Sequence, residues 1–370
     1  MSSIKKIIFF IPNIERGGIE KNFLILTKYF SDKNYKVEVL CFKISKDILL
    51  KIDKKIIIKK SKNFLSFINI FNSNKIYNII NCFLYFCFKL QKQNNAIIFS
   101  MQNHPFAVIL SKIKNINCII RIANHPETSL KFLNNKIIFH IKLFIKIFFY
   151  KFAKVIICNS KSSSTFLKKK IKNNIITIYN PLNLKHLIKK KKKLNFLLSV
   201  GRLEKQKNFL GLIDAFYIVL KKFPNFKLII IGDGNEKYEL IKKINKLKIK
   251  NKVIFKKFIK PDYFFLTSKI FILNSLFEGM PNVILESLLN KCPVISTNCE
   301  SGPKEILKNK KFGYLVHTNN HIDLSNKINY VLSNYAEAKK KTLLGYKSLN
   351  RFELNAQCTK YKTIVDRSFS

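Results

Sequence analysis

Short apolar runs alternate with stretches of helical periodicity along almost the whole chain. The predicted strands are 4–11, 37–42, 56–58, 96–100, 117–122, 155–159 and 175–178 in the first half, and 196–200, 226–231, 253–255, 270–273 and 293–296 in the second. Helical periods cover 21–30, 64–91, 209–222 and 236–247, and the end of the chain is also helical in pattern. Short strands that alternate with helices predict an α/β fold with parallel sheets covered on both faces.

The pattern restarts once, after a polar, lysine-rich segment at 184–194. A chain of 370 residues is long enough for two domains. We therefore expect two doubly wound, Rossmann-like domains, residues 1–184 and 185–346, followed by a helical segment at 347–370. Ligands of such folds bind at the carboxyl ends of the strands, so the sequence predicts a cleft where the two domains face each other.

The net charge of +48, from 69 basic and 21 acidic residues, would normally suggest nucleic acid or an anionic membrane as a partner. The basic residues are mostly lysine, and the chain is equally rich in Ile, Asn and Phe, which indicates a compositional drift rather than a binding patch. The few arginines are Arg16, Arg121, Arg202, Arg351 and Arg367. Because they are not clustered and no aromatic-lined basic motif accompanies them, we expect no nucleic acid, although a basic nucleic-acid-binding protein remains the alternative suggested by charge.

The eight cysteines lie mostly inside apolar runs, without a CxxC or a Cys/His spacing typical of metal ligands. They are expected to be buried thiols in a reducing compartment. The apolar run near the start is too short for a signal-peptide core, and no uncharged apolar run reaches about 18 residues. These features predict a cytoplasmic protein without a transmembrane helix.

The segment 136–154 places lysines among bulky apolar residues, as KIIFHIKLFIKIFFYKFAK. Such a basic apolar helix can lie on an anionic membrane surface, with the lysine stems reaching up to the headgroups. It can equally pack between a sheet and a neighbouring helix. Peripheral association with the inner face of the cell membrane is therefore one of two open readings.

The stretch NSLFEGMPNVILESLLNKCPVISTNCESGPKEIL, residues 274–307, predicts a loop, a helix, a buried strand and a second loop. Glu278 precedes the helix and Glu286 lies one turn inside it. Pro281 is expected at the first helical position, where its missing N–H costs nothing. The free N–H groups of this helix start favour an anion or a hydroxyl group. A surface helix with two acids on it is the simpler alternative.

Other candidate groups also follow predicted strands. Arg202 and Lys207 follow the strand at 196–200, and two cations there suit a diphosphate. Gly17 and Gly18 lie between the first strand and a helix, where a backbone without Cβ atoms can approach a ligand closely. His125 follows the strand at 117–122. No pair of aspartates has the D-x-D spacing of a Mg²⁺-nucleotide site, so we expect no metal.

Taken together, the motifs resemble those of family-4 glycosyltransferases with the GT-B fold, in the same order and over nearly the whole chain. The matching segments are GGIE at 17–20, IYNPLN at 178–183, GRLEKQKN at 201–208, IGDG at 231–234 and EGMPNVILE at 278–286. Lys257 and Lys291 depart from the pattern, because glycine is common at both places in the family. The resemblance implies that the final helix crosses back onto the first domain.

The resemblance further implies a retaining, metal-independent transfer from a nucleotide-sugar, which is a co-substrate rather than a cofactor. By this likeness Glu286 holds the ribose, Glu278 holds the donor sugar, and Arg202 and Lys207 neutralise the diphosphate. The remaining positions implied at the donor site are Gly17, Gly18, His125, Gly279, Met280, Pro281 and Asn282. The motif variants are similar to enzymes of bacterial surface polysaccharide and lipopolysaccharide synthesis, with UDP-hexose or UDP-N-acetylhexosamine donors and glycan or lipid-linked acceptors. A GT-B protein that binds nucleotide-sugars without transferring them is the alternative.

Overall fold

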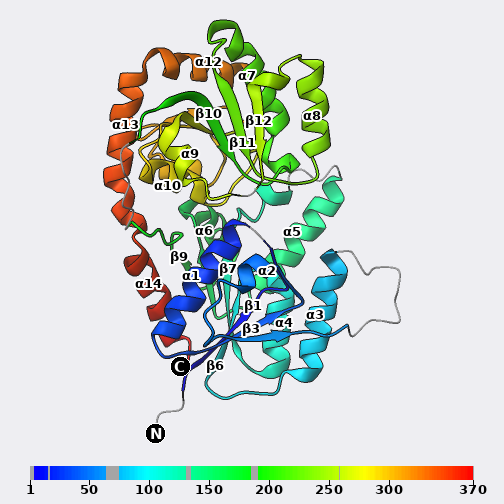
Figure 1. Ribbon diagram of the computed structural model, residues 1–370. Helices are drawn as coiled ribbons and strands as arrows, with labels where there is room; N and C mark the ends of the chain where they lie inside the picture. Colours follow the sequence, from blue (N-terminus) through cyan, green and yellow to red (C-terminus); the bar gives the residue numbers. More distant parts are fainter. Residues whose placement is uncertain are drawn as a thin grey trace. The chain divides into compact units, whose positions relative to one another are not determined.

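The computed structural model describes residues 4–15, 17–63, 75–130, 135–184, 191–257 and 259–369. The chain forms two compact units (Figure 1). Unit 1 consists of Met1–Pro181 together with Leu354–Ser370, and unit 2 consists of Leu182–Glu353. Each is an α/β unit built on its own parallel sheet, as the alternating pattern predicts.

Unit 1 contains a seven-stranded parallel sheet with the order β5-β3-β1-β6-β7-β8-β9. Its strands are β1 (Lys6–Phe10), β3 (Lys36–Cys41), β5 (Ile57–Lys60), β6 (Ala96–Ser100), β7 (Asn117–Ile122), β8 (Val155–Cys158) and β9 (Ile175–Thr177). A two-residue pair, β2 (Asn13–Ile14) with β4 (Lys43–Ile44), lies outside this sheet. The inner strands are almost entirely buried, as expected for a parallel sheet covered by helices, whereas the edge strands β5 and β9 are more exposed.

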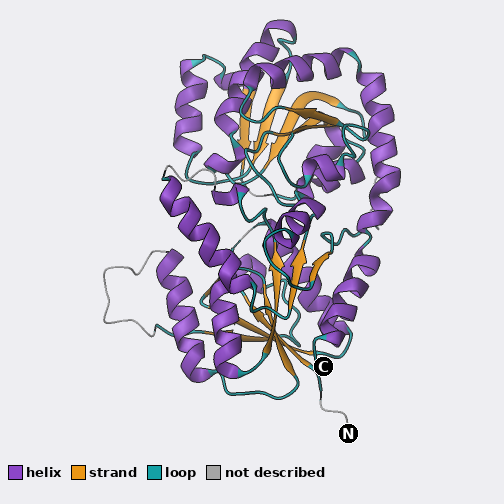
Figure 2. Ribbon diagram, turned by 180° about the vertical axis from the view of Figure 1, so that it is seen from behind, coloured by secondary structure: helices purple, strands orange, loops and turns teal. Residues whose placement is uncertain are grey.

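Helices cover both faces of this sheet (Figures 1 and 2). One apolar core forms against α1 (Gly18–Asp32) and α14 (Leu354–Arg367), and the other against α3 (Lys75–Lys89), α4 (His104–Lys114) and α5 (Lys136–Tyr150). Two shorter helices, α2 (Lys46–Leu49) and α6 (Lys161–Lys168), complete the unit. The last helix of the chain therefore belongs to the core of unit 1.

A buried arginine connects α14 to this core. Arg121 on β7 is completely buried, its Nε donates to the Tyr361 hydroxyl at 2.9 Å, and its Nη2 donates to Asn180 Oδ1 at 2.6 Å. Tyr361 lies on α14 and Asn180 lies in the IYNPLN segment. The Arg121 guanidinium thus bonds to both segments that connect unit 1 with unit 2: the one that ends at Pro181 and the one that begins at Leu354.

Asp366, near the end of α14, provides a second attachment. Its carboxylate accepts hydrogen bonds from Tyr35 at 2.5 Å, Lys362 at 2.6 Å and Lys5 at 2.9 Å. Burial by itself would raise the pKa of Asp366, but these hydrogen bonds outweigh burial and lower the pKa to about 2. Ionisation of Asp366 therefore stabilises the folded state relative to the unfolded chain.

Unit 2 contains a six-stranded parallel sheet with the order β12-β11-β10-β13-β14-β15. Its strands are β10 (Leu194–Val200), β11 (Lys227–Ile231), β12 (Val253–Lys256), β13 (Ser268–Leu273), β14 (Val294–Thr297) and β15 (Tyr314–Val316). Its helices are α7 (Phe209–Lys222), α8 (Lys237–Lys246), α9 (Asp262–Thr267), α10 (Asn282–Leu289), α11 (Pro303–Ile306), α12 (His321–Ser333) and α13 (Tyr335–Lys347). The order reverses at β10 and β13, so these two strands flank the position where a doubly wound sheet binds its ligand.

The predicted strands correspond closely to those in the structure, and the helix at 209–222 is confirmed at both ends. The strand β15 was not predicted, because three apolar residues give too short a pattern. The predicted helix at 64–91 is observed from Lys75, and its residues 64–74 lie outside the described part, as do residues 185–190 of the lysine-rich segment. Seven of the eight cysteines are buried and Cys87 is half-buried, which confirms their expected placement.

Among the described residues, no helix combines the length and the apolar character needed to cross a membrane.

Candidate functional site

Two loops meet at the carboxyl ends of β10 and β13 in unit 2. The first, residues 201–208, is called loop A, and the second, residues 274–282, is called loop B. Leu276 N donates to Gln206 O at 2.8 Å, and Gln206 Nε2 donates to Phe277 O at 2.9 Å. Asn274 Nδ2 also donates to the main-chain oxygen of Asn208 at 2.9 Å. The two loops are thus held together by main-chain and amide hydrogen bonds before any charged side chain is considered.

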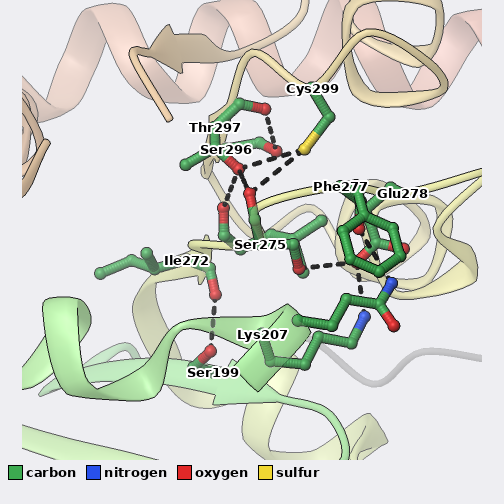
Figure 3. Close-up of polar contacts among 11 residues, drawn as sticks. Ser199, Lys207, Ile272, Ser275, Phe277, Glu278, Ser296, Thr297 and Cys299 are labelled. Carbon is green, nitrogen blue, oxygen red and sulfur yellow. Dashed lines mark hydrogen bonds and ion pairs between the residues drawn. The ribbon is translucent and has the colours of Figure 1, made fainter. Parts of the chain in front are cut away.

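The central charged contact joins Lys207 of loop A to Glu278 of loop B (Figure 3). Lys207 Nζ lies 2.5 Å from Glu278 Oε1, and the Ser275 hydroxyl donates to the same oxygen at 2.6 Å. The side chain of Lys207 is 16% exposed and that of Glu278 only 7%. Because the pair is largely shielded from water, its charges interact far more strongly than an exposed ion pair would.

The end of β14 supports loop B from behind. Thr297 Oγ1 donates to Ser275 O at 2.5 Å, and Cys299 Sγ lies 3.2 Å from the same oxygen (Figure 3). Burial raises the pKa of the Cys299 thiol to about 12, with a further contribution from the nearby Glu278 carboxylate. Cys299 is therefore a neutral thiol that packs against the loop and not a nucleophile.

The SGP sequence at 301–303 packs against the part of loop B that precedes α10. The Ser301 hydroxyl donates to Gly279 O at 3.1 Å. Gly302 has φ +85°, and a Cβ atom there would lie 2.0 Å from the same oxygen. Only glycine fits this close approach, so the second half of the 274–307 stretch fixes the backbone of the first half.

The helix α10 starts one residue later than predicted. Pro281 precedes it in an extended conformation (φ −71°, ψ 107°), and Asn282 is the first helical residue. The prediction of Pro281 at the first helical position is therefore wrong by one residue, and proline still suits the place because no helical hydrogen bond is lost. Glu286 lies within α10 and is half-buried, whereas Gly279, Met280 and Pro281 are buried.

Arg202 lies at the start of loop A and is much more exposed than Lys207. Its side chain is 46% exposed, and its Nη1 lies 3.2 Å from Glu204 Oε1. Exposed ion pairs of this kind are weak, typically about 0–1 kcal/mol. A more highly charged anion at the strand ends would therefore compete readily with Glu204 for this guanidinium.

The GDGN segment, residues 232–235, contacts loop A through its main chain. Leu203 N donates to Asp233 O at 2.9 Å, and Glu236 N donates to Leu203 O at 3.0 Å. A Cβ atom on Gly232 would lie 1.9 Å from Gly201 O. These contacts show that GDGN packs against loop A and supports it.

In unit 1, the Gly17-Gly18 pair is exposed at the start of α1, after β1. Glu20 lies in the first turn of this helix, is 7% exposed, and accepts a hydrogen bond from Gln102 Nε2 at 3.2 Å. A Cβ atom on Gly17 would lie 2.6 Å from Glu20 Oε2. The GGIE motif thus places a carboxylate directly over the glycine turn, where it supports the exposed backbone.

The histidines that follow strands in unit 1 are both buried. His125 is 3% exposed, its Nδ1 accepts from Thr128 N at 3.4 Å, and its ring packs against Phe166. His104 Nδ1 lies 2.8 Å from the Ser100 hydroxyl, and burial lowers the pKa of His104 to about 3. His104 is therefore a neutral structural residue, whereas His125 lies at the end of β7, where the sequence predicts it.

Of the predicted residues of unit 2, the structure places Lys207 and Glu278 in contact, and it adds others that sequence reasoning missed. Ser275, Gln206 and Thr297 help to hold the two loops, and they lie inside the segments 201–208 and 274–307 without having been singled out there. A usable signal is that they are polar residues at or after the ends of buried strands: Thr297 ends β14, Ser275 lies two residues after β13 and Gln206 lies six residues after β10. The site combines cations for a diphosphate with carboxylates that can accept hydrogen bonds from sugar hydroxyls.

A family model described as glycosyl transferases group 1 matches residues 183–348, which is almost all of unit 2. The chain is also 26% identical to the amylovoran biosynthesis glycosyltransferase AmsD of Erwinia amylovora over 324 residues, which cover 84% of this chain and 85% of that protein.

A Campylobacter jejuni enzyme named N-acetylgalactosamine-N,N'-diacetylbacillosaminyl-diphospho-undecaprenol 4-alpha-N-acetylgalactosaminyltransferase is 33% identical over 204 residues. That match covers 52% of this chain and 54% of the enzyme, so the chain spans about half the length of this relative. Among solved structures, Anabaena Alr3699/HepE in complex with UDP and glucose superposes with a TM-score of 0.79 at 18% identity, and covers 98% of this chain and 100% of that one. The latter likeness establishes a shared fold.

Proposed function

We propose that this chain, a glycosyltransferase of group 1 with the GT-B fold, transfers a sugar from a nucleotide-sugar to a glycan or lipid-linked acceptor in surface polysaccharide synthesis. The observation that carries the proposal is the shielded Lys207–Glu278 pair at the sheet's switch point. A nucleotide-sugar carries a diphosphate next to a sugar, so a cation for the phosphate and a carboxylate for the sugar hydroxyls are needed side by side. The likeness to the Erwinia and Campylobacter enzymes supports the acceptor class.

In the proposed reaction, the bond between the anomeric carbon and the diphosphate oxygen breaks, and the acceptor oxygen bonds to the same face of the sugar. Negative charge grows on the departing diphosphate. In this proposal Lys207 and Arg202 neutralise the growing charge, and this stabilisation increases in the transition state. The acceptor's proton passes to the departing phosphate oxygen, so the mechanism needs neither a strong protein base nor a metal ion.

Each remaining group has a proposed role in the same complex. Glu278 accepts hydrogen bonds from the sugar hydroxyls, Glu286 holds the ribose, and the main chain of 279–282 contacts sugar and phosphate. In the same proposal, Gly17 and Gly18 border the donor phosphates and the acceptor, and His125 lies near the donor sugar. The donor is a UDP-linked hexose or N-acetylhexosamine, a proposal supported by the names of the Anabaena complex and the Campylobacter enzyme. With a lipid-linked acceptor, the enzyme would work in the cytoplasm at the inner face of the cell membrane.

The test is a panel of UDP-glucose, UDP-galactose and their N-acetyl forms, assayed for UDP release with and without EDTA. We expect one donor to be turned over equally in both conditions. Replacing Glu278 by Gln, or Arg202 by Ala, should lower kcat/KM by about 100-fold or more, as for other groups that stabilise developing charge. NMR of the product should show the anomeric configuration of the donor, and inversion would refute the retaining mechanism.

Lys243→Met is the matched control, because Lys243 and Asp214 form another 2.5 Å lysine–carboxylate pair in unit 2. It joins α8 to α7, away from the strand ends, so its loss should leave kcat/KM unchanged. The alternative, a protein that binds nucleotide-sugars without transferring them, predicts donor binding by calorimetry but no turnover with any donor. Full activity of the Glu278 variant would overturn the site assignment.

A further inference from the structure

The helix α5 carries a continuous apolar stripe on its solvent side. The exposed large apolar residues of α5 and the turn after it are Ile137, Ile138, Ile141, Phe144, Ile145, Phe148 and Phe152. Their spacing follows the helical period, and Ile137 and Phe144 are 70% and 69% exposed. Isolated apolar residues are common on protein surfaces, whereas a contiguous patch of this kind marks an interaction site.

The helix itself is well formed. The Asn135 side chain caps it by accepting from Ile137 N at 2.8 Å and Ile138 N at 3.2 Å. The rings of Phe144 and Phe148 have centroids 6.1 Å apart, and those of Phe148 and Phe152 5.3 Å apart. On the side opposite the stripe, α5 packs against α4, and Tyr150 at its end is buried in the core of unit 1. The stripe is therefore an ordered surface of unit 1.

Lysines border the stripe on both sides. Lys142 follows Ile141 and Lys151 precedes Phe152, so at about 100° per residue they lie on opposite flanks of it. From the neighbouring helix α4, Lys112 Nζ lies 5.9 Å from the Phe152 ring centroid. This arrangement lets the ammonium groups reach outward past the apolar side chains.

The surrounding sequence contains almost no acidic residues. Between Asp53 and Glu204 the chain has one acid, Glu127. The basic residues are spread evenly along the chain, but the part that contains α3, α4 and α5 lacks the acids that offset them elsewhere, so its net positive charge is locally higher. Such a surface complements an anionic partner.

From this combination we propose that the α5 stripe docks on an anionic lipid bilayer. The apolar side chains enter the boundary between headgroups and acyl chains, and the flanking lysines bind lipid phosphates. A nucleic acid would pair with the lysines but would leave the apolar side chains of the stripe exposed to water. A second copy would satisfy the stripe but would bring two sets of lysines together without acids to offset them. The inference does not depend on the transfer reaction.

The first experiment uses the absence of tryptophan from the chain. Phe144→Trp creates a single reporter in the stripe, and Tyr238→Trp creates a matched one on α8 of unit 2, where Tyr238 is 73% exposed. With vesicles of phosphatidylglycerol and phosphatidylcholine, the Phe144→Trp emission should shift to the blue and be quenched by brominated lipid, while the control emission stays unchanged. An unshifted Phe144→Trp emission, or an equal shift in both variants, would overturn the proposal.

The second experiment measures binding by vesicle co-sedimentation. Replacing both Lys142 and Lys151 by Glu should weaken binding by at least about 25-fold, since each lysine near such a surface contributes about fivefold. Replacing both Lys242 and Lys246 on α8 by Glu makes the same change of charge elsewhere and should have little effect. Equal binding to pure phosphatidylcholine would refute the role of the lysines. Dimers without lipid, with the Phe144→Trp emission already shifted to the blue, would assign the stripe to self-association instead.

Discussion

Removal of the Lys207 charge tests the candidate site most directly, because the structure allows the cost to be worked out for each partner. Lys207→Met keeps the length of the side chain but leaves the Glu278 carboxylate 7% exposed, with the Ser275 hydroxyl as a remaining hydrogen-bond donor. Breaking a buried pair from one side typically costs about 3–5 kcal/mol. Because Lys207 keeps some exposure, we expect the free energy of unfolding of unit 2 to fall by about 2–4 kcal/mol.

Removing the charge of Glu278 instead should lower the free energy of unfolding by less. Glu278→Gln leaves an ammonium group on a flexible stem that is already 16% exposed and can turn toward water, so we expect a loss of about 1–2 kcal/mol. The double variant contains no unpaired charge and should recover to within about 1 kcal/mol of the wild type. The Lys243–Asp214 pair, whose side chains are 26% and 31% exposed, is more accessible to water than Lys207–Glu278 and serves as the control, with an expected loss of about 0–1 kcal/mol for Lys243→Met.

The assay is thermal unfolding followed by calorimetry, combined with UDP release. For a unit of this size, the Lys207→Met loss corresponds to a Tm lowered by about 5–10 °C. Stability should return in the double variant, but transfer should not if Lys207 has the proposed role of neutralising the diphosphate. If Lys207→Met and Lys243→Met lower Tm equally, the pair is screened by solvent and the reasoning from burial is wrong. If transfer returns with stability, the pair is structural only.

Three further changes test other parts of the structure. Asp366→Asn should cost about 1–2 kcal/mol at pH 7; the folded pKa lies below the unfolded one, so this contribution is complete above about pH 4 and disappears toward pH 2. Urea unfolding at several pH values checks it, and a pH-independent difference would contradict the ion-pair account. Tyr361→Phe removes a hydrogen-bond acceptor from buried Arg121 and should cost about 1–3 kcal/mol in urea unfolding, against almost nothing for the surface hydroxyl removed by Tyr29→Phe. Lys291 ends α10 with φ 50°, so Lys291→Gly should stabilise unit 2 by about 0.5–1 kcal/mol in the same assay, whereas Lys291→Ala should not.

Much of the candidate site could be located from sequence because its residues follow strands. Arg202 and Lys207 follow β10, and Glu278 follows β13 after a short loop. The ends of parallel strands lie at one edge of a sheet, so polar residues at these places converge whatever the intervening sequence. What the pattern could not provide was the pairing of Lys207 with Glu278, since several cations follow strands in so basic a chain.

The sequence by itself determined the order of strands and helices and the α/β class, because apolar period and turn residues are properties of neighbouring residues. It determined the segments β6 and β7 to the residue. Which side chains pair with one another was decided only by the tertiary structure. Lys207 and Glu278 are 71 residues apart, and Arg121 and Tyr361 are 240 apart. Likewise, the apolar pattern of α5 suits a buried helix and a membrane-facing one equally. Its exposure follows from which side α4 and the core of unit 1 cover, and a local sequence pattern carries no information about neighbours that are distant in the chain.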